Sequence, residues 1–166
     1  MHSLRVLRIV EGTSVDGPRL RTSVYLAGCP HHCLGCHNPQ SWDFAGGEEM
    51  TVDQVMAVVN ENDAPVTLSG GDPLAQAEAV GELARRVKAA GYNLWCFTGY
   101  TWEEIQRRPD LMDVVGHFDV LVDGRFEQDK RDISLLFRGS ANQRLIDVRQ
   151  TLKSRQVVIW QPDTAF

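Results

Sequence analysis

Three cysteines close together carry the clearest chemical signal in this sequence. Cys29, Cys33 and Cys36 follow the spacing Cys-x3-Cys-x2-Cys, so their thiolates can converge on a single metal centre. A closed structural zinc site needs four protein ligands, and an electron-transfer iron–sulfur cubane normally has four cysteines. Three ligands leave one position open, which is how a metal centre keeps room for a substrate.

Two alternatives complete the site with a fourth protein ligand. His31, His32 or His37 could turn the three cysteines into a Cys3His zinc site, and Cys96 could supply a fourth thiolate. Cys96 lies in an apolar run, where a lone cysteine usually serves as a small core residue. Taken singly, His31 and His32 are expected to be solvated loop residues.

The composition bounds the possible classes of protein. The chain has 166 residues, 17 Lys and Arg against 22 Asp and Glu, 43% hydrophobic residues and 23% charged residues. These values predict one folded domain, exclude global disorder and argue against a nucleic-acid-coating role. We find no apolar stretch long enough for a membrane helix and no signal-peptide pattern at the start, so we expect a cytoplasmic protein with reduced thiols.

Apolar runs and capping boxes outline alternating strands and helices. The expected strands are Leu4–Val10, Thr22–Ala27, Pro65–Leu68, Tyr92–Phe97 and Phe118–Val122, with two later ones at Arg144–Val148 and Gln156–Trp160. The expected helices follow the capping boxes Thr51–Gln54 and Thr101–Glu104, begin after Pro73, and span Leu111–Val115. This alternation predicts a single α/β domain with a mainly parallel sheet.

Two loops are expected to meet at one edge of this sheet. The cysteine loop follows the strand Thr22–Ala27, and Ser69–Pro73 follows the strand Pro65–Leu68. Ligands of open α/β sheets bind beyond the carboxyl ends of the strands, so both loops should share a crevice. Taken alone, Gly70-Gly71-Asp72-Pro73 is typical of a strand-to-helix turn, although its glycines would also let a ligand approach the backbone.

The cysteine motif resembles the cluster motif of the radical S-adenosylmethionine (SAM) enzymes. Asp16-Gly17-Pro18 before it and Cys36-His37-Asn38-Pro39 after it are similar to one branch, the activating enzymes of glycyl-radical enzymes. Ser69–Pro73 looks like the SAM-binding turn of that family. Four more segments resemble the activating proteins of anaerobic ribonucleotide reductase: Thr98–Thr101, Val122–Phe126, Phe137–Ser140 and Asn142–Arg144. Arg19 stands where the family usually has a glycine.

The resemblance implies an oxidoreductase with one [4Fe-4S] cluster and SAM as cofactors, on a truncated, open (β/α) radical SAM barrel that spans residues 1–166. Its cluster loop would be residues 29–37. Cys29, Cys33 and Cys36 would bind three irons, and SAM would chelate the fourth. The residues implied to contact SAM are Gly35, Cys36, His37, Gly70, Gly71 and Asp72. Cleavage of SAM would give a 5′-deoxyadenosyl radical, and no catalytic residue is expected beyond cluster and SAM.

The resemblance also implies partners. The radical would take a hydrogen atom from a glycine on the large catalytic subunit of anaerobic ribonucleotide reductase, with an electron donor such as flavodoxin; no nucleic acid or membrane is expected. The polar segment 123–142 is either a solvated loop or a docking surface for that partner. Two other functions stay open: activation of another glycyl-radical enzyme, such as pyruvate formate-lyase, and a non-enzymatic iron–sulfur or zinc binding module.

Overall fold

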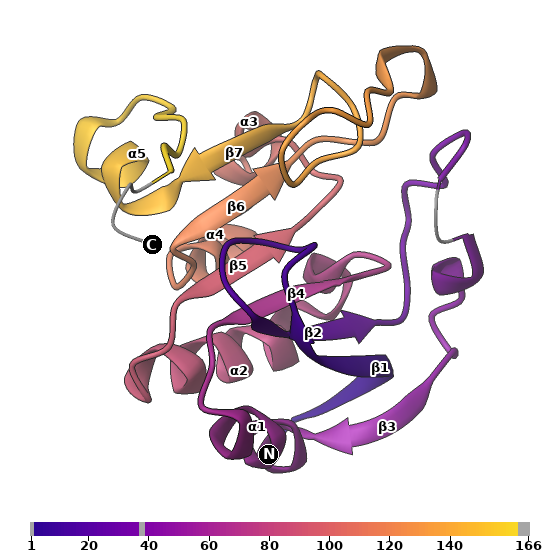
Figure 1. Cartoon of the computed structure of the whole chain (residues 1–166), viewed down its shortest axis with the longest axis vertical. Helices are drawn as coiled ribbons and strands as arrows, with labels where there is room; N and C mark the ends of the chain where they lie inside the picture. Colours follow the sequence, from indigo (N-terminus) through magenta and orange to yellow (C-terminus); the bar gives the residue numbers. More distant parts are fainter. Residues whose placement is uncertain (1, 37–38, 163–166) are drawn as a thin grey trace.

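A computed structural model describes residues 2–36 and 39–162, and within them seven strands form one open mixed sheet (Figure 1). In spatial order the strands are β3 (Glu48–Thr51), β1 (Ser3–Thr13), β2 (Arg21–Leu26), β4 (Val66–Gly70), β5 (Leu94–Phe97), β6 (Val120–Asp123) and β7 (Arg144–Asp147). The central strands β2, β4, β5 and β6 are parallel, and the outer pairs are antiparallel. The predicted α/β domain with a mainly parallel, unclosed sheet is therefore confirmed.

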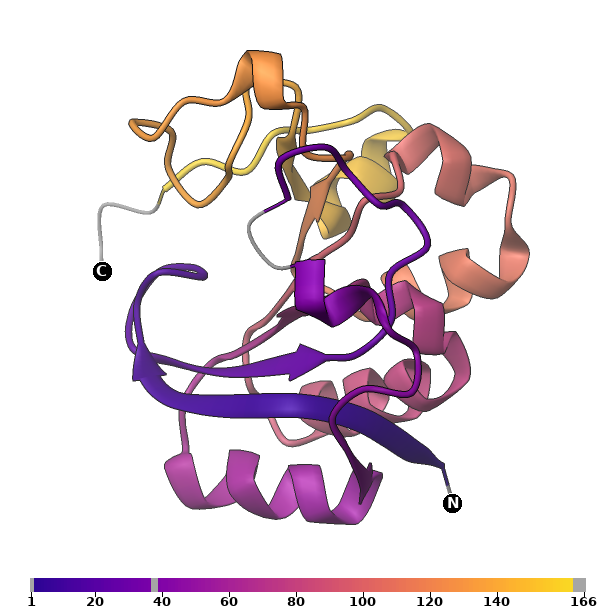
Figure 2. The same ribbon diagram turned by 90° about the vertical axis from the view of Figure 1, so that its right-hand side faces the viewer.

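Four helices cover one face of the sheet (Figures 1 and 2). They are α1 (Val52–Asn62), α2 (Ala77–Ala89), α3 (Trp102–Gln106) and α4 (Pro109–Val115). Their apolar faces pack against alternate residues of the strands, such as Leu94 and Cys96 of β5, to form the main core. Trp95 of β5 points to the other face, where it packs against Phe137 and Trp160.

Both predicted capping boxes are present. The Thr51 side chain accepts from the backbone of Gln54, whose side chain accepts from the backbone of Thr51, and Thr101 and Glu104 repeat this arrangement at α3. Each box satisfies backbone N–H groups that the first helical turn leaves unpaired. The chain after β4 begins with a 3-10 turn, Pro73–Gln76, before α2 starts.

The predicted strand at Gln156–Trp160 is wrong. Only Ile159 makes a bridge there, with Ile146 of β7. The preceding residues form α5 (Val148–Ser154), which begins where Asp147 caps the helix by accepting from the backbone of Gln150. This helix uses Val148, the residue expected to end the strand, so β7 is one residue shorter than predicted.

The loops that follow the parallel strands gather at one end of the sheet. The connection from β2 to β3, which contains the predicted cluster loop and is called the cluster loop below, is described at residues 27–36 and 39–47. It and the arm, residues 123–142, both lie at the carboxyl ends of β2, β4, β5 and β6 (Figure 1). The cluster loop contains a 3-10 turn at Pro39–Trp42, and the arm contains one at Gln128–Lys130 and a bridge between Arg131 and Ser140. In the described part of the chain, no helix has the length and apolar character needed to cross a membrane.

Candidate functional site

A cavity of about 470 Å³ lies at the carboxyl ends of the parallel strands. The three cysteines of the motif, Cys29, Cys33 and Cys36, line it on one side. Ser69, Gly70 and Gly71 of the turn after β4 line it on another. The sequence predicted that these two loops share a crevice, and the structure brings them together around this one.

The three motif cysteines are free thiols in different degrees of burial. Cys29 is buried, whereas Cys33 and Cys36 are half-buried. Burial raises the pKa of Cys29, and hydrogen bonds from the backbone N–H groups of His31 and His32 to its sulfur partly oppose that rise. Burial also raises the pKa of Cys33, and a hydrogen bond from the backbone N–H of Phe126 partly opposes that rise. At these two sulfur atoms, backbone donors therefore offset part of the penalty that burial places on the thiolate.

The turn after β4 lies directly against the start of the cluster loop. Gly71 donates to the carbonyl of Leu26 at 2.7 Å, and the backbone N–H of Asp72 donates to the carbonyl of Gly28 at 2.7 Å. A Cβ on Gly70 would lie 2.3 Å from the Leu26 nitrogen, and one on Gly71 would lie 2.4 Å from the Gly28 oxygen. Glycine is required here because the two backbones approach each other closely.

The other residues expected at the SAM site differ in their placement. Gly35 has φ +75°, and a Cβ there would lie 2.9 Å from the side chain of Gln128 in the arm. The side chain of Asp72 is fully buried. Among the described residues, the hydrogen-bond partners of its carboxylate are His31, Leu74, Thr98 and Gly99. His37 lies outside the described residues.

Three of the four candidate fourth ligands, Cys96, His31 and His32, make other contacts; the fourth, His37, lies outside the described residues. Cys96 is fully buried in the core of β5, where burial raises its pKa well above the ordinary value. His31 contacts Asp72 through Nε2 at 2.7 Å, and His32 stacks on Trp42 with ring centroids 4.5 Å apart. Over residues 2–36 and 39–162, no three His, Cys, Asp or Glu side chains are arranged to hold a single metal ion.

The inner wall of the cavity contains polar residues that the sequence did not single out as a site. Tyr25 of β2 donates its hydroxyl to Asp16, and the Arg8 guanidinium lies 4.4 Å from the Tyr25 ring centre. Burial, followed by the bond to Asp16, raises the pKa of Tyr25 to about 12. Alternation along β2 was the available signal, because it turns Tyr25 away from the helices. Arg19 in the adjoining loop has φ +66°, the conformation for which the family's glycine is suited.

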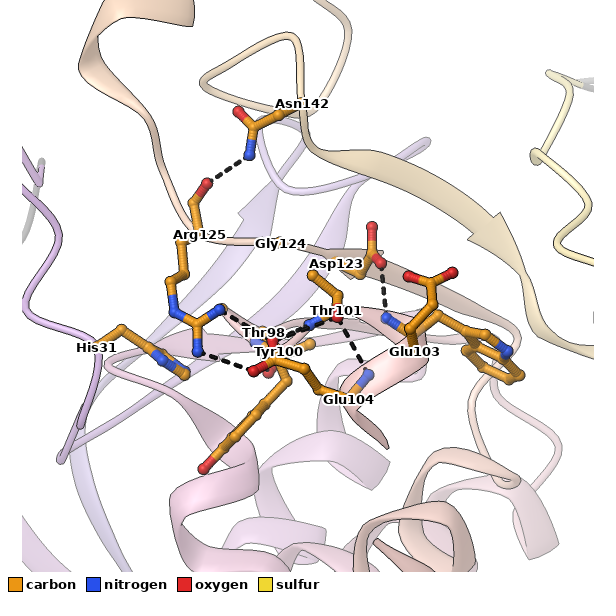
Figure 3. Close-up of polar contacts among 12 residues, drawn as sticks. His31, Thr98, Tyr100, Thr101, Glu103, Glu104, Asp123, Gly124, Arg125 and Asn142 are labelled. Carbon is orange, nitrogen blue, oxygen red and sulfur yellow. Dashed lines mark hydrogen bonds and ion pairs between the residues drawn. The ribbon is translucent and has the colours of Figure 1, made fainter. Parts of the chain in front are cut away.

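A charged groove of about 390 Å³ adjoins the cavity and shares Gly124 with it. Arg125 forms two hydrogen bonds with Glu104, at 2.9 and 3.1 Å, and Asn142 donates to the Arg125 carbonyl at 2.7 Å (Figure 3). Asp123 accepts from the backbone N–H of Trp102, which opens α3. These contacts hold the start of the arm against α3 and against Asn142 at the arm's other end.

The donor set and the cavity fit an iron–sulfur cluster with a ligand beside it. Three thiols suit iron–sulfur chemistry, and the volume of about 470 Å³ falls within the range of small-molecule sites. The fold and this cavity thus define a class of protein: an open α/β sheet whose strand ends present a three-cysteine loop.

Comparisons with known proteins agree with that class. Residues 15–146 match the family described as a 4Fe-4S single cluster domain. The chain is 38% identical over 139 residues to the anaerobic ribonucleoside-triphosphate reductase-activating protein of Pasteurella multocida, covering 78% of this chain and 88% of that protein. It is 37% identical over 139 residues to the Escherichia coli K12 protein of the same name, and the match covers 78% of this chain and 89% of that protein. The protein of that name from phage T4 is 33% identical over 146 residues, and the match covers 83% of this chain and 90% of the phage protein.

A solved structure shares the fold. QueE from Escherichia coli superposes with a TM-score of 0.50 and 15% sequence identity, covering 60% of this chain and 53% of QueE. The chain itself belongs to the family of anaerobic ribonucleoside-triphosphate reductase-activating proteins, and its central part is a 4Fe-4S single cluster domain.

Proposed function

We propose that this chain is a radical SAM activating enzyme that generates a glycyl radical on the large catalytic subunit of an anaerobic ribonucleoside-triphosphate reductase. The convergence of Cys29, Cys33 and Cys36 on one cavity carries the proposal, in a chain 37–38% identical to proteins named for that activation. When bound, cluster and SAM supply a one-electron cleavage of the sulfonium and a carbon radical that removes a hydrogen atom from glycine.

The protein's part is to bind and orient these groups within a single radical SAM domain, residues 1–166. Cys29, Cys33 and Cys36 would hold three irons and leave the fourth to SAM. Contacts to SAM are assigned to Gly35, Cys36, His37, Gly70 and Gly71. Because the amino group of SAM donates hydrogen bonds, backbone carbonyls at the turn after β4 are suited to receive it. Asp72 supports that turn from below.

The partner is proposed to dock between the cluster loop and the arm, residues 123–142. Large apolar side chains are exposed there: Ile133 is 91% exposed, Leu34 79% and Leu136 49%. Such side chains beside a cavity favour a protein contact. Flavodoxin is proposed as the electron donor. A reducing compartment, the cytoplasm, is proposed because all four cysteines are free thiols.

Anaerobic reconstitution tests the proposal. The protein would be loaded with iron and sulfide, reduced with dithionite and mixed with SAM, and 5′-deoxyadenosine would be quantified. We expect product with the parent protein and none with Cys33→Ala. Electron paramagnetic resonance (EPR) of a mixture with the reductase subunit should then show a glycyl radical.

The failures have distinct meanings. A well-formed cluster that yields no 5′-deoxyadenosine would contradict SAM cleavage and favour a binding module. Formation of 5′-deoxyadenosine without a glycyl radical on the reductase would contradict the proposed partner. Pyruvate formate-lyase would then be the next enzyme to test.

A further inference from the structure

A buried contact joins the cluster loop to the turn after β4. His31, between Cys29 and Cys33, places Nε2 2.7 Å from Oδ2 of Asp72. We propose that this His31–Asp72 contact is an anchor that fixes the first turn of the cluster loop and thereby tunes the cluster held by the three cysteines. The inference rests on the proposed function only in requiring that a cluster binds there.

The Asp72 carboxylate is built to receive this anchor. It is fully buried, and one oxygen accepts from the Leu74 backbone at 3.0 Å while the other accepts from the Gly99 backbone at 2.9 Å. The Thr98 hydroxyl lies 2.9 Å from both oxygens. A buried carboxylate is tolerated only with such a set of donors. Among the described residues, His31 is its one donor from the cluster loop, so this contact ties that loop to β4 and β5.

The His31 ring sits in a site shaped for it. The side chain is 4% exposed, and its ring meets Tyr100 edge-on with centroids 4.7 Å apart (Figure 3). A Cβ on Gly99 would lie 2.3 Å from His31 Cδ2, so only glycine leaves room for the ring. His32, the next residue, is exposed and stacks on Trp42 instead. The sequence therefore places two adjacent histidines in different environments.

The anchored residue also contributes to the cluster's first sulfur. The backbone N–H groups of His31 and His32 are hydrogen-bonded to the Cys29 sulfur. Hydrogen bonds to cysteine sulfur are one of the factors that set the potential of an iron–sulfur cluster. Reduction adds negative charge, which these N–H dipoles stabilise. Loosening the loop should therefore make the midpoint potential more negative, although no iron ligand is removed. His31 and Asp72 act as positioning residues.

The test compares His31→Leu with His31→Gln, which retains an N–H donor, and with His32→Asn. The last variant removes the neighbouring imidazole at φ +49°, a conformation that asparagine tolerates. Each protein would be reconstituted anaerobically without SAM or reductase. The measurements are iron content, the EPR spectrum of the reduced cluster, its midpoint potential, and the rate of iron loss to a chelator.

We expect His31→Leu to lose iron about 10-fold faster or more, as for other groups that support metal ligands, with a changed EPR spectrum and a more negative potential. His31→Gln should restore most of the parent behaviour, and His32→Asn should match the parent. If His31→Leu does not fold, Gly99→Ala, which crowds the ring, should give the same shift in potential.

Equal potentials, spectra and iron loss for His31→Leu and His32→Asn would overturn the anchor. If His31→Leu does not fold, a cluster potential in Gly99→Ala equal to that of the parent would also overturn the anchor. A parent cluster that cleaves no SAM would contradict the proposed function and leave the anchor intact, provided the His31 shift is seen. A parent protein that assembles no cluster would overturn both proposals.

Discussion

Arg144 holds the buried carboxylate of Asp123 through both oxygens. Its Nε lies 3.1 Å from Oδ1 and its Nη2 lies 2.6 Å from Oδ2, with side-chain exposures of 32% for Arg144 and 1% for Asp123. Asp123 also accepts from the backbone N–H of Trp102 at 2.8 Å. The pair therefore joins β7 to the end of β6 and to the start of α3, at the edge of the proposed SAM cavity.

Arg144→Met should destabilise the fold strongly. It leaves the Asp123 carboxylate buried without its cation, which costs about 3–5 kcal/mol for a fully buried pair and about 2–3 kcal/mol for this partly exposed arginine. Urea unfolding of the cluster-free protein would measure the change. The matched control is Arg108→Met, whose pair with Asp110 is 51% and 58% exposed and should therefore contribute little to stability. Equal losses in the two variants would contradict a special role for the buried pair.

Local patterns predicted the central elements because each depends on neighbouring residues. The Thr51 and Thr101 boxes act over three residues, and their helices begin where the sequence indicates. The strand β3, Glu48–Thr51, was missed because it is short and polar. It forms only because β1 offers a backbone edge, with Leu4 opposite Met50. Propensity carries little information about such an edge strand.

In the candidate site, too, the features that depend on neighbouring residues were predicted and those that depend on distant residues were not. The three cysteines were found from their spacing, and the Gly70–Gly71 turn from its position after a strand and its resemblance to the family's SAM-binding turn; both line one cavity. Sequence reasoning treated His31 as a solvated residue and Asp72 as a ligand contact. Their mutual contact spans 41 positions, and it depends on the end of β5 supplying Thr98 and Gly99. A pattern confined to one loop cannot reveal a hydrogen bond completed by a strand far away in the sequence.

Gly99→Ala should destabilise the protein because the added methyl group meets the His31 ring. The Cβ would lie 2.3 Å from Cδ2 and 2.7 Å from Nε2, closer than atoms pack. Overpacking of this kind costs about 1–3 kcal/mol. Gly116→Ala is the control, since the nearest atom to its Cβ would lie 3.5 Å away. Thermal unfolding should separate the two variants, and identical melting temperatures would show that the His31 ring does not occupy this site.

Glu104 should titrate far below an ordinary glutamate. Its two hydrogen bonds with Arg125, followed by the bond from the Thr101 backbone, lower its pKa to about 2. Because the pKa is lower in the folded state, Glu104 stabilises the protein at pH values above 4.5, the pKa in the unfolded chain. This stabilisation is lost as the pH falls from 4.5 towards 2. Because the pair is more than one-third exposed, its contribution is about 1 kcal/mol at most.

Carboxyl carbon shifts in an NMR titration of the cluster-free protein would measure that pKa. Arg125→Ala should raise the pKa of Glu104 towards 4.5, whereas Arg107→Ala, which removes an exposed arginine just after α3, should leave it near 2. An unchanged pKa in Arg125→Ala would show that Arg125 does not hold the carboxylate.

Cys96→Ala should keep the cluster. The thiol lies in the core of β5, and its hydrogen-bond acceptor is the adjacent Phe97 carbonyl at 3.7 Å. Removing one buried sulfur atom costs about 1–2 kcal/mol of stability through the lost packing. Iron content and 5′-deoxyadenosine formation should therefore match the parent, while Cys36→Ala should lose both. Loss of iron in Cys96→Ala, with the fold intact by circular dichroism, would instead make Cys96 a fourth ligand and the centre a closed one without room for SAM.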